Sequence, residues 1–113
     1  MQFAGTPVYM APELFQKRQY DEKVDVFAFG ALLWELAMRE VPYDGLDPAD
    51  IRAKVEKGEP LKLRTNMDPQ LQPLINACRE VDYTKRCNFD RIVQVLGSLR
   101  WIYHLQHNYS KIK

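Results

Sequence analysis

The sequence predicts a mainly α-helical protein, and two kinds of observation carry that prediction. Residues 24–38 form a run in which twelve of fifteen residues are apolar, with Leu, Ala, Met and Glu dominating its second half. These residues are strong helix formers, so a helix is preferred over a short strand at 24–29. Two later segments, 71–78 and 89–103, repeat apolar residues at spacings of three and four, which indicates helices with one buried face.

The length and charge of the chain exclude several classes of protein. The 113 residues fit one domain. Sixteen basic residues oppose fifteen acidic ones without any basic run, so no nucleic-acid partner is indicated. At roughly 22 Å, a helix over 24–38 is shorter than the about 30 Å of membrane hydrocarbon, so we expect no membrane span. Cys78 and Cys87 follow no signal peptide, which favours two reduced thiols in a cytoplasmic protein.

The first part of the chain is expected to lead into one buried helix. Residues 1–13 contain a glycine and two prolines, and they predict a loop that closes into a short helical turn at 12–15. Polar residues at 16–23 then connect to the helix over 24–38, which is apolar nearly all round and should be buried on most sides. Pro42 lies just beyond this helix and marks its end.

Capping residues define the next helix. Asp47 is an N-cap followed by Pro48 at the first helical position, and Gly58 is a C-terminal stop. A loosely attached helix is therefore predicted over 48–57, with few apolar residues. Residues 59–67 are predicted to form a loop.

Two further helices are predicted in the second half of the chain. Pro73 conflicts with a helix that starts at Asp68, and a start within 71–73 removes the conflict. One face of this helix would carry Leu71, Leu74, Ile75 and Cys78. Asn88 is an N-cap for a last helix that we expect to reach about Gln106. Its apolar positions are Phe89, Ile92, Val93, Leu96, Leu99 and Tyr103.

Two short motifs carry a resemblance to a known family. The segment 5–13 (Gly-Thr-Pro-Val-Tyr-Met-Ala-Pro-Glu) resembles the end of a protein-kinase activation segment. The segment 25–30 (Asp-Val-Phe-Ala-Phe-Gly) is similar to the start of the central helix of the kinase C-lobe, and both occur in the family's order and spacing. The resemblance covers roughly residues 3–99. Leu-Leu-Trp-Glu-Leu at 32–36 resembles the tyrosine-kinase-like group, whose members mostly phosphorylate Ser and Thr. The implied fold is a partial kinase C-lobe without an N-lobe.

The resemblance also implies roles for individual residues. The substrate loop of the family would here consist of Gly5, Thr6, Pro7, Val8 and Tyr9. Glu13 would form a buried ion pair with Arg86, and Asp25 would accept hydrogen bonds from the backbone of the catalytic loop. Without the resemblance, Thr6 is a turn hydroxyl, Arg86 a solvated charge and Asp25 an acid favoured by the helix dipole.

The segment 82–89 departs from the family pattern Asp-Pro-x-x-Arg-Pro-x-Phe. Tyr83 and Cys87 stand where prolines are usual, and Arg79 stands where a Trp is common. These departures put the rigidity of the loop in question, while the overall match remains.

The sequence motifs that protein kinases use for phosphoryl transfer are not recognisable in the 113 residues. Glycines stand at 5, 30, 45, 58 and 97, so no Gly-x-Gly exists, and neither His-Arg-Asp nor Asp-Phe-Gly occurs. We therefore expect a fragment of a Ser/Thr protein kinase that is inactive as it stands. ATP and Mg²⁺ are implied only for an intact parent, and no cofactor is expected in this chain. The alternative is a non-catalytic helical interaction module derived from a kinase C-lobe.

Further expectations concern domains, partners and metals. Residues 1–99 are predicted to be a partial kinase domain and 100–113 a C-terminal extension, helical and then frayed. Expected partners are a protein substrate, a partner protein or a missing upstream kinase segment, with neither nucleic acid nor membrane. His104 and His107 have no Cys or carboxylate between or near them, so no metal is expected.

The central helix would keep only part of its cover in an isolated fragment. We expect such a chain to be only marginally stable, and to be aggregated, self-associated or dependent on a partner, because exposed large apolar side chains favour association. The face around Phe27, Leu33 and Trp34 is the predicted contact surface.

Overall fold

The computed structural model describes residues 7–16 and 18–98, and within these residues the chain is helical without strands. Its elements are the 3-10 turn η1 (Pro7–Tyr9) and the α-helices α1 (Pro12–Phe15), α2 (Lys23–Met38), α3 (Pro48–Lys57), α4 (Leu71–Cys78) and α5 (Phe89–Gly97). The predicted mainly α fold is confirmed. The bounds predicted for α1 and α3 agree with the structure, and α4 starts within the predicted range.

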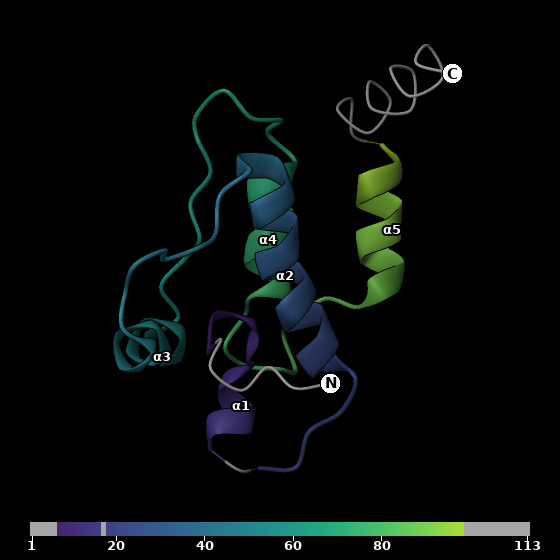
Figure 1. The fold of residues 1–113 in the computed structure, drawn as a ribbon. Coiled ribbons are helices and arrows are strands. Elements are labelled where there is room, and N and C mark those ends of the chain that lie inside the picture. Colours follow the sequence, from purple (N-terminus) through teal and green to yellow (C-terminus); the bar gives the residue numbers. More distant parts are fainter. Residues whose placement is uncertain (1–6, 17, 99–113) are drawn as a thin grey trace, which may run out of the picture.

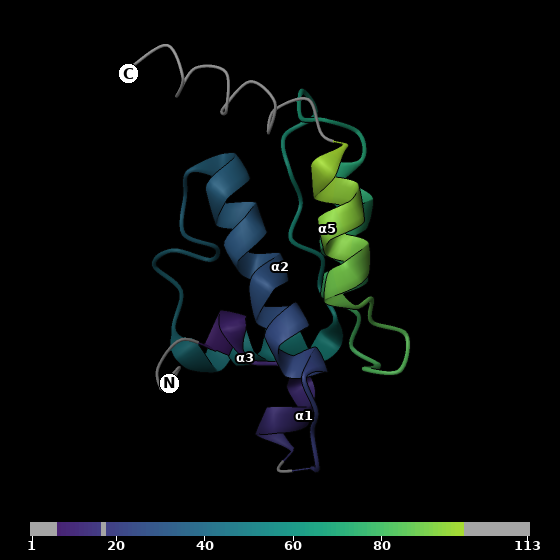
Figure 2. The same ribbon diagram turned by 90° about the vertical axis from the view of Figure 1, so that its right-hand side faces the viewer.

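The α2 helix runs through the middle of the fold, and the other elements gather around it (Figure 1). The α4 helix packs along α2, while η1 and α1 lie at the N-terminal end of α2. The α3 helix packs against η1, and the turned view shows α5 running alongside the α2–α4 pair (Figure 2). A central apolar helix is thus covered by elements that precede and follow it in the sequence.

The principal core joins α2, α4, α5, η1 and the loop before α4. Its buried side chains are Val8, Val26, Ala31, Leu33, Trp34, Met38, Leu61, Leu71, Leu74, Ile75, Cys78 and Ile92. The four α4 residues predicted to share one face are all in this cluster, so that prediction is confirmed. A second, smaller cluster contains Ala11, Phe27 and Val55 and ties the α1 region and α3 to α2.

A glycine allows α2 and α4 to approach closely. A Cβ atom placed on Gly30 would lie 2.8 Å from Cβ of Cys78 and 2.9 Å from Cδ of Arg79. Such distances are shorter than real side-chain contacts, so only the missing side chain permits this packing.

The α2 helix is covered on most sides, but one strip remains in solvent. Leu32 is 45% exposed and Leu36 is 59% exposed, and they lie one turn apart on the helix. The predicted contact face was wrong, because Phe27, Leu33 and Trp34 are all buried. Leu33 and Trp34 belong to the core shared with α4, and Phe27 packs in the cluster shared with α3.

The loop between α3 and α4 is fixed by two side chains, one on α2 and one on α4. The indole Nε1 of Trp34 donates to the carbonyl of Lys62 at 2.9 Å. Gln72 accepts from the backbone N–H of Leu63 at 2.8 Å and donates to the carbonyl of Leu61 at 2.9 Å. These bonds satisfy backbone groups that no secondary structure pairs, and they hold Leu61 in the core.

The predicted cap of α5 is confirmed, but its predicted buried face is partly wrong. The Asn88 side chain accepts from the backbone N–H of Arg91 at 2.9 Å. Ile92 is buried, whereas Phe89 is 41% exposed and Val93 is 69% exposed. The periodicity located the helix, but nothing in it shows which part of a broad apolar stripe meets the core.

Several expectations fall outside the described residues. They are the extension of the last helix to Gln106, the segment 100–113, and His104 and His107. Asp47 takes the N-cap position of α3 as predicted, but its side chain makes no capping hydrogen bond. Within the described ranges, none of the helices has the length and apolar character needed to cross a membrane.

Candidate functional site

The predicted substrate-loop residues lie at the N-terminal edge of the described structure. Gly5 and Thr6 fall outside the described residues, whereas Pro7, Val8 and Tyr9 form η1. Pro7 and Val8 are buried and Tyr9 is half-buried. The backbone N–H of Met10 donates to the carbonyl of Pro7 at 3.0 Å, which closes the turn. This turn sits directly on the core rather than projecting from it.

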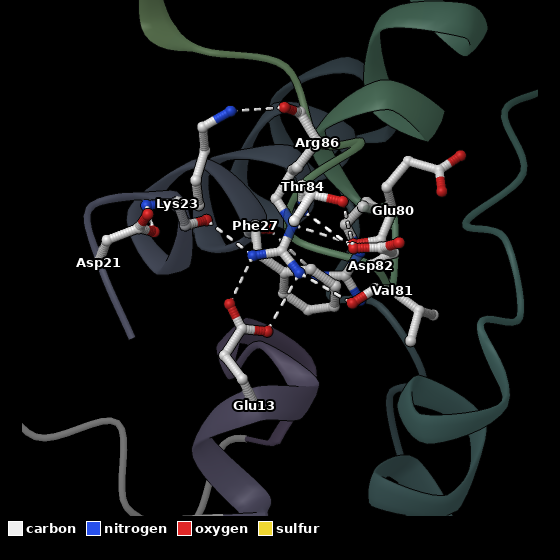
Figure 3. Close-up of polar contacts among 10 residues, drawn as sticks. Glu13, Asp21, Lys23, Phe27, Glu80, Val81, Asp82, Thr84 and Arg86 are labelled. Atoms are coloured by element: carbon white, nitrogen blue, oxygen red, sulfur yellow. Dashed lines mark hydrogen bonds and ion pairs between the residues drawn. The ribbon is translucent and has the colours of Figure 1, made fainter. Parts of the chain in front are cut away.

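Glu13 and Arg86 meet in a buried ion pair (Figure 3). The Nη1 atom of Arg86 lies 2.9 Å from Oε2 of Glu13, and Nη2 lies 3.1 Å from Oε1. The geometry is bidentate, which gives a charge-assisted pair both strength and a fixed orientation. Arg86 is 2% exposed and Glu13 is 5% exposed, so each charge depends on the other.

The remaining N–H groups of Arg86 all reach backbone carbonyls. Nη1 donates to Lys23 at 3.0 Å, Nε donates to Glu80 at 2.9 Å and Nη2 donates to Val81 at 3.3 Å. A guanidinium has five N–H donors, and together with the two bonds to Glu13 all five are satisfied. Arg86 therefore ties α1, the start of α2 and the loop after α4 together at one point (Figure 3).

Lys23, the first residue of α2, also binds Arg86. Its Nζ atom donates to the carbonyl of Arg86 at 2.6 Å, while its own carbonyl accepts from the Arg86 side chain. Each of the two residues thus binds the other's backbone, and this pins the first residue of α2 to the loop after α4.

A second buried arginine, which the sequence analysis did not identify as a site residue, holds η1. Nη1 of Arg79 donates to the carbonyl of Val8 at 2.6 Å and to the carbonyl of Phe27 at 3.3 Å. Its guanidinium carbon lies 3.9 Å from the ring centroid of Phe27, and that of Arg86 lies 5.0 Å from the same centroid. Two cations therefore contact one aromatic ring, which is a favourable arrangement for each of them.

The environment of Arg79 is unusual for a cation. Burial, with a further contribution from nearby Arg86, lowers the pKa of Arg79 to about 10. Among the described residues, its guanidinium donates to the carbonyl oxygens of Val8 and Phe27 rather than to a carboxylate. The only signal in the sequence was that Arg79 stands where Trp is common in kinases. Like a Trp, the Arg79 side chain ends in a flat group, and this group lies against the ring of Phe27.

The loop that carries Arg86 is held by local hydrogen bonds in place of the usual prolines. Oδ1 of Asp82 accepts from the backbone N–H of Thr84 at 3.0 Å and from its hydroxyl at 2.7 Å. These bonds to Thr84 lower the pKa of Asp82 below its usual value. Backbone bonds from Lys85 to Asp82 and from Arg86 to Tyr83 close the turn. An Asx turn thus replaces proline rigidity.

Asp25 is not among the residues that these hydrogen bonds join. It occupies the first turn of α2 and is exposed, where a carboxylate is favoured by the positive end of the helix dipole. No side-chain hydrogen bond or ion pair of Asp25 occurs among the described residues. Within the same ranges, no group of three or more His, Cys, Asp or Glu side chains is placed to hold a metal.

Comparison with known proteins places this arrangement in a family context. The family described as protein tyrosine and serine/threonine kinase matches residues 4–96. The serine/threonine-protein kinase CTR1 of Arabidopsis thaliana is 39% identical over 97 residues, which are 85% of this chain and 12% of that protein. The serine/threonine/tyrosine-protein kinase HT1 of the same plant is 40% identical over 93 residues, 81% of this chain and 24% of that protein.

The match includes residues 8–13, which Arg79 and Arg86 hold, the helices α1 to α4, and α5 as far as Leu96. The chain spans no more than a quarter of the length of these two relatives. On the family match over most of its residues, the chain belongs to the protein tyrosine and serine/threonine kinase family.

Proposed function

We propose that the chain is the part of a Ser/Thr protein kinase that forms and supports the substrate-binding loop. The observation that carries this proposal is the double anchoring of segment 8–13 on the helical scaffold. Arg79 binds the carbonyl of Val8 at one end of the segment, and Arg86 binds the carboxylate of Glu13 at the other. A loop that recognises a peptide must be held rigidly, because binding to an ordered loop avoids the entropy of ordering it.

The proposal assigns roles to residues on either side of the anchors. In a longer parent, residues 5–9 would contact the protein substrate beside its phosphoacceptor Ser or Thr. Asp25, exposed at the start of α2, would accept hydrogen bonds from the catalytic loop. Both assignments rest on the family resemblance. We also propose a cytoplasmic parent, because its two cysteines are free thiols here and the cytoplasm keeps thiols reduced.

By themselves the 113 residues are proposed to transfer no phosphate. Phosphoryl transfer needs groups that cradle the phosphates and hold Mg²⁺, and no motif for either is recognisable in this sequence. ATP and Mg²⁺ would be bound by other parts of a longer protein. Calorimetric titration of the chain with Mg-ATP tests this, and no specific heat of binding is expected. Micromolar binding that a non-hydrolysable analogue competes for would overturn it.

A chimera tests the substrate-loop assignment. Residues 4–96 of this chain would replace the matching segment in the kinase domain of HT1, to which the chain is 40% identical. We expect the chimera to phosphorylate a generic Ser/Thr substrate, and Arg86→Ala within it to abolish that activity. Arg91→Ala is the matched control, since Arg91 is an exposed arginine on α5. A folded chimera without activity would contradict the assignment.

A second candidate function is a non-catalytic helical interaction module. The observation that favours it is the exposed pair Leu32 and Leu36 on α2, a short apolar strip of the kind that protein partners cover. The activity of the chimera distinguishes the two candidate functions, because an interaction module need not support phosphoryl transfer.

A further inference from the structure

The two cysteines of the chain lie against each other outside the anchored segment. Cys78 is the last residue of α4, and Cys87 directly precedes the Asn88 cap of α5. Their Sγ atoms are 3.7 Å apart, and both are free thiols. The backbone N–H of Cys87 donates to the carbonyl of Ala77 at 3.2 Å, which holds the two backbone segments side by side.

The two thiols differ in their access to solvent. Cys78 is fully buried, whereas Cys87 is half-buried. A small oxidant therefore reaches Cys87 first. Burial, followed by the neighbouring Cys87, raises the pKa of the Cys78 thiol, while the cations Arg79 and Arg86 act in the opposite direction.

We propose that Cys78 and Cys87 are an oxidative modification site that hydrogen peroxide converts into an intramolecular disulfide. The sulfur atoms must approach by roughly 1.7 Å to reach the bond length of about 2.05 Å. Rotation of the half-buried Cys87 side chain supplies that movement, because the backbone hydrogen bond between the segments remains in place.

The reaction proceeds in two balanced steps. Cys87 loses its proton to solvent, and its thiolate attacks one peroxide oxygen, so that the S–O bond forms as the O–O bond breaks and hydroxide leaves. The Cys78 thiolate then attacks the Cys87 sulfur, forming the S–S bond and releasing the second hydroxide. The two hydroxides take up the two thiol protons as water. The thiols lose two electrons in all, and one peroxide is reduced to two waters.

The disulfide would close a ring of ten residues, 78–87, that contains both buried arginines. Cross-linking restricts the unfolded chain, so the oxidised form should unfold at a higher temperature than the reduced form. The bond would therefore fasten the segment from which Arg79 and Arg86 reach towards residues 8–13. Reduction by a dithiol would reverse the change.

Peptide mapping of the full 113-residue chain tests the proposal. Trypsin cleaves after Arg64, Arg79, Arg86 and Arg91, so the two cysteines fall on the separate peptides 65–79 and 87–91. After treatment of a dilute solution with hydrogen peroxide and alkylation, we expect loss of both free thiols and a linked pair of these peptides. Dithiothreitol should return both thiols, and the oxidised chain should show a raised Tm.

Two variants serve as controls for the order of the steps. In Cys78→Ser, Cys87 should stop at sulfenic acid, which dimedone traps. In Cys87→Ser, the buried Cys78 should keep its free thiol at the same peroxide dose. The proposal is overturned if the folded wild-type chain retains two free thiols at a dose that oxidises the urea-unfolded chain. It is also overturned if dimedone labels wild-type Cys87 to the same extent as in Cys78→Ser, or if the linked peptides join two chains.

Discussion

Glu13 and Arg86, 73 positions apart in the sequence, are joined by two parallel hydrogen bonds of 2.9 and 3.1 Å in a buried site. The pair therefore joins the beginning of the described structure to the loop after α4. Because both groups are almost fully buried, removing either one leaves a charge without its partner in a medium of low polarity.

The first prediction is that these two residues are strongly coupled in stability. Glu13→Ala and Arg86→Ala should each lower the free energy of unfolding by about 3–5 kcal/mol, since each leaves an uncompensated buried charge. The double variant should lose less than the sum, because neither charge remains. Urea denaturation of the four proteins gives the coupling energy.

The exposed pair of Arg52 and Glu56, 3.1 Å apart, is the matched control. Surface pairs of this kind contribute about 0–1 kcal/mol, so its cycle should be close to additive. If the Glu13–Arg86 losses also add, the ion pair does not connect the two segments energetically.

The second prediction concerns Arg79. Arg79→Ala should lower the free energy of unfolding by about 2–4 kcal/mol, because the carbonyls of Val8 and Phe27 lose their donor inside the protein. Arg79→Lys should also destabilise, since an ammonium cannot stack flat on Phe27 while bonding both carbonyls. Thermal unfolding compares both with Arg91→Ala, in which an exposed arginine is removed. A loss no larger than that of Arg91→Ala would show that the buried contacts contribute nothing.

The third prediction uses two helical glycines in different surroundings. Gly30→Ala should destabilise by about 1–3 kcal/mol, because the new Cβ would lie 2.8 Å from Cβ of Cys78. Gly97→Ala should instead stabilise by about 0.5–1 kcal/mol, since the new Cβ would meet no side chain or distant backbone of the described residues within 4 Å and alanine favours a helix. Equal effects of the two substitutions on the free energy of unfolding would argue against close contact between α2 and α4.

The elements that the sequence predicted best are those bounded by local chemistry. The bounds of α3 follow from Pro48 at its start and Gly58 at its end, where φ is +75°, a conformation that glycine adopts freely. Asn88 likewise caps α5 through a bond three residues away. Such signals act within one turn of helix, so tertiary structure does not alter them.

Contacts between residues far apart in the sequence could not be predicted from local patterns. No local pattern indicates that Arg79 reaches Val8, 71 positions earlier, and the pairing of Glu13 with Arg86 was expected only from the family resemblance. The covered side of α2 was also unpredictable. A helix that is apolar all round carries no hydrophobic stripe to show which side faces the core. Leu33 was therefore predicted to lie on a contact surface, whereas Leu33 is buried and its neighbour Leu32 is exposed.

The fourth prediction concerns the pH dependence of stability at Glu35. One carboxyl oxygen of Glu35 is buried without a hydrogen-bond partner among the described residues, and burial raises the pKa of this carboxyl. The folded state therefore disfavours the charge, and this destabilisation is present above the folded-state pKa and absent below the unfolded value of about 4.3. Glu35→Gln should thus raise Tm at pH 7.

The gain in Tm from Glu35→Gln should shrink as the pH falls towards about 4.3, because the wild-type carboxyl then takes up its proton in both states. Glu56→Gln, which removes an exposed and ion-paired carboxylate, should show no such gain at pH 7. Scanning calorimetry at several pH values measures both. A gain that is independent of pH would exclude the titration of Glu35 as its cause.

The last prediction concerns the exposed strip of α2. Leu32 and Leu36 continue the line of Phe29, which contacts Phe89 of α5 with ring centroids 5.8 Å apart. Leaving a large apolar side chain in water forgoes roughly 1.5–3 kcal/mol, and the total stability of a domain is only about 5–15 kcal/mol. The isolated chain should therefore self-associate through this strip, and its Tm should rise with protein concentration.

Substitutions distinguish association through Leu32 and Leu36 from nonspecific association of other exposed apolar side chains. Leu32→Gln with Leu36→Gln should shift the sedimentation profile towards monomer, because the shared apolar contact is lost. Leu46→Gln, at a position 40% exposed on the turn before α3, should leave association unchanged. A wild-type chain that sediments as a monomer and unfolds sharply above about 60 °C at every concentration would contradict the prediction. The described helices would then cover the core sufficiently alone, and the interaction-module candidate would be favoured over the fragment of a larger catalytic domain.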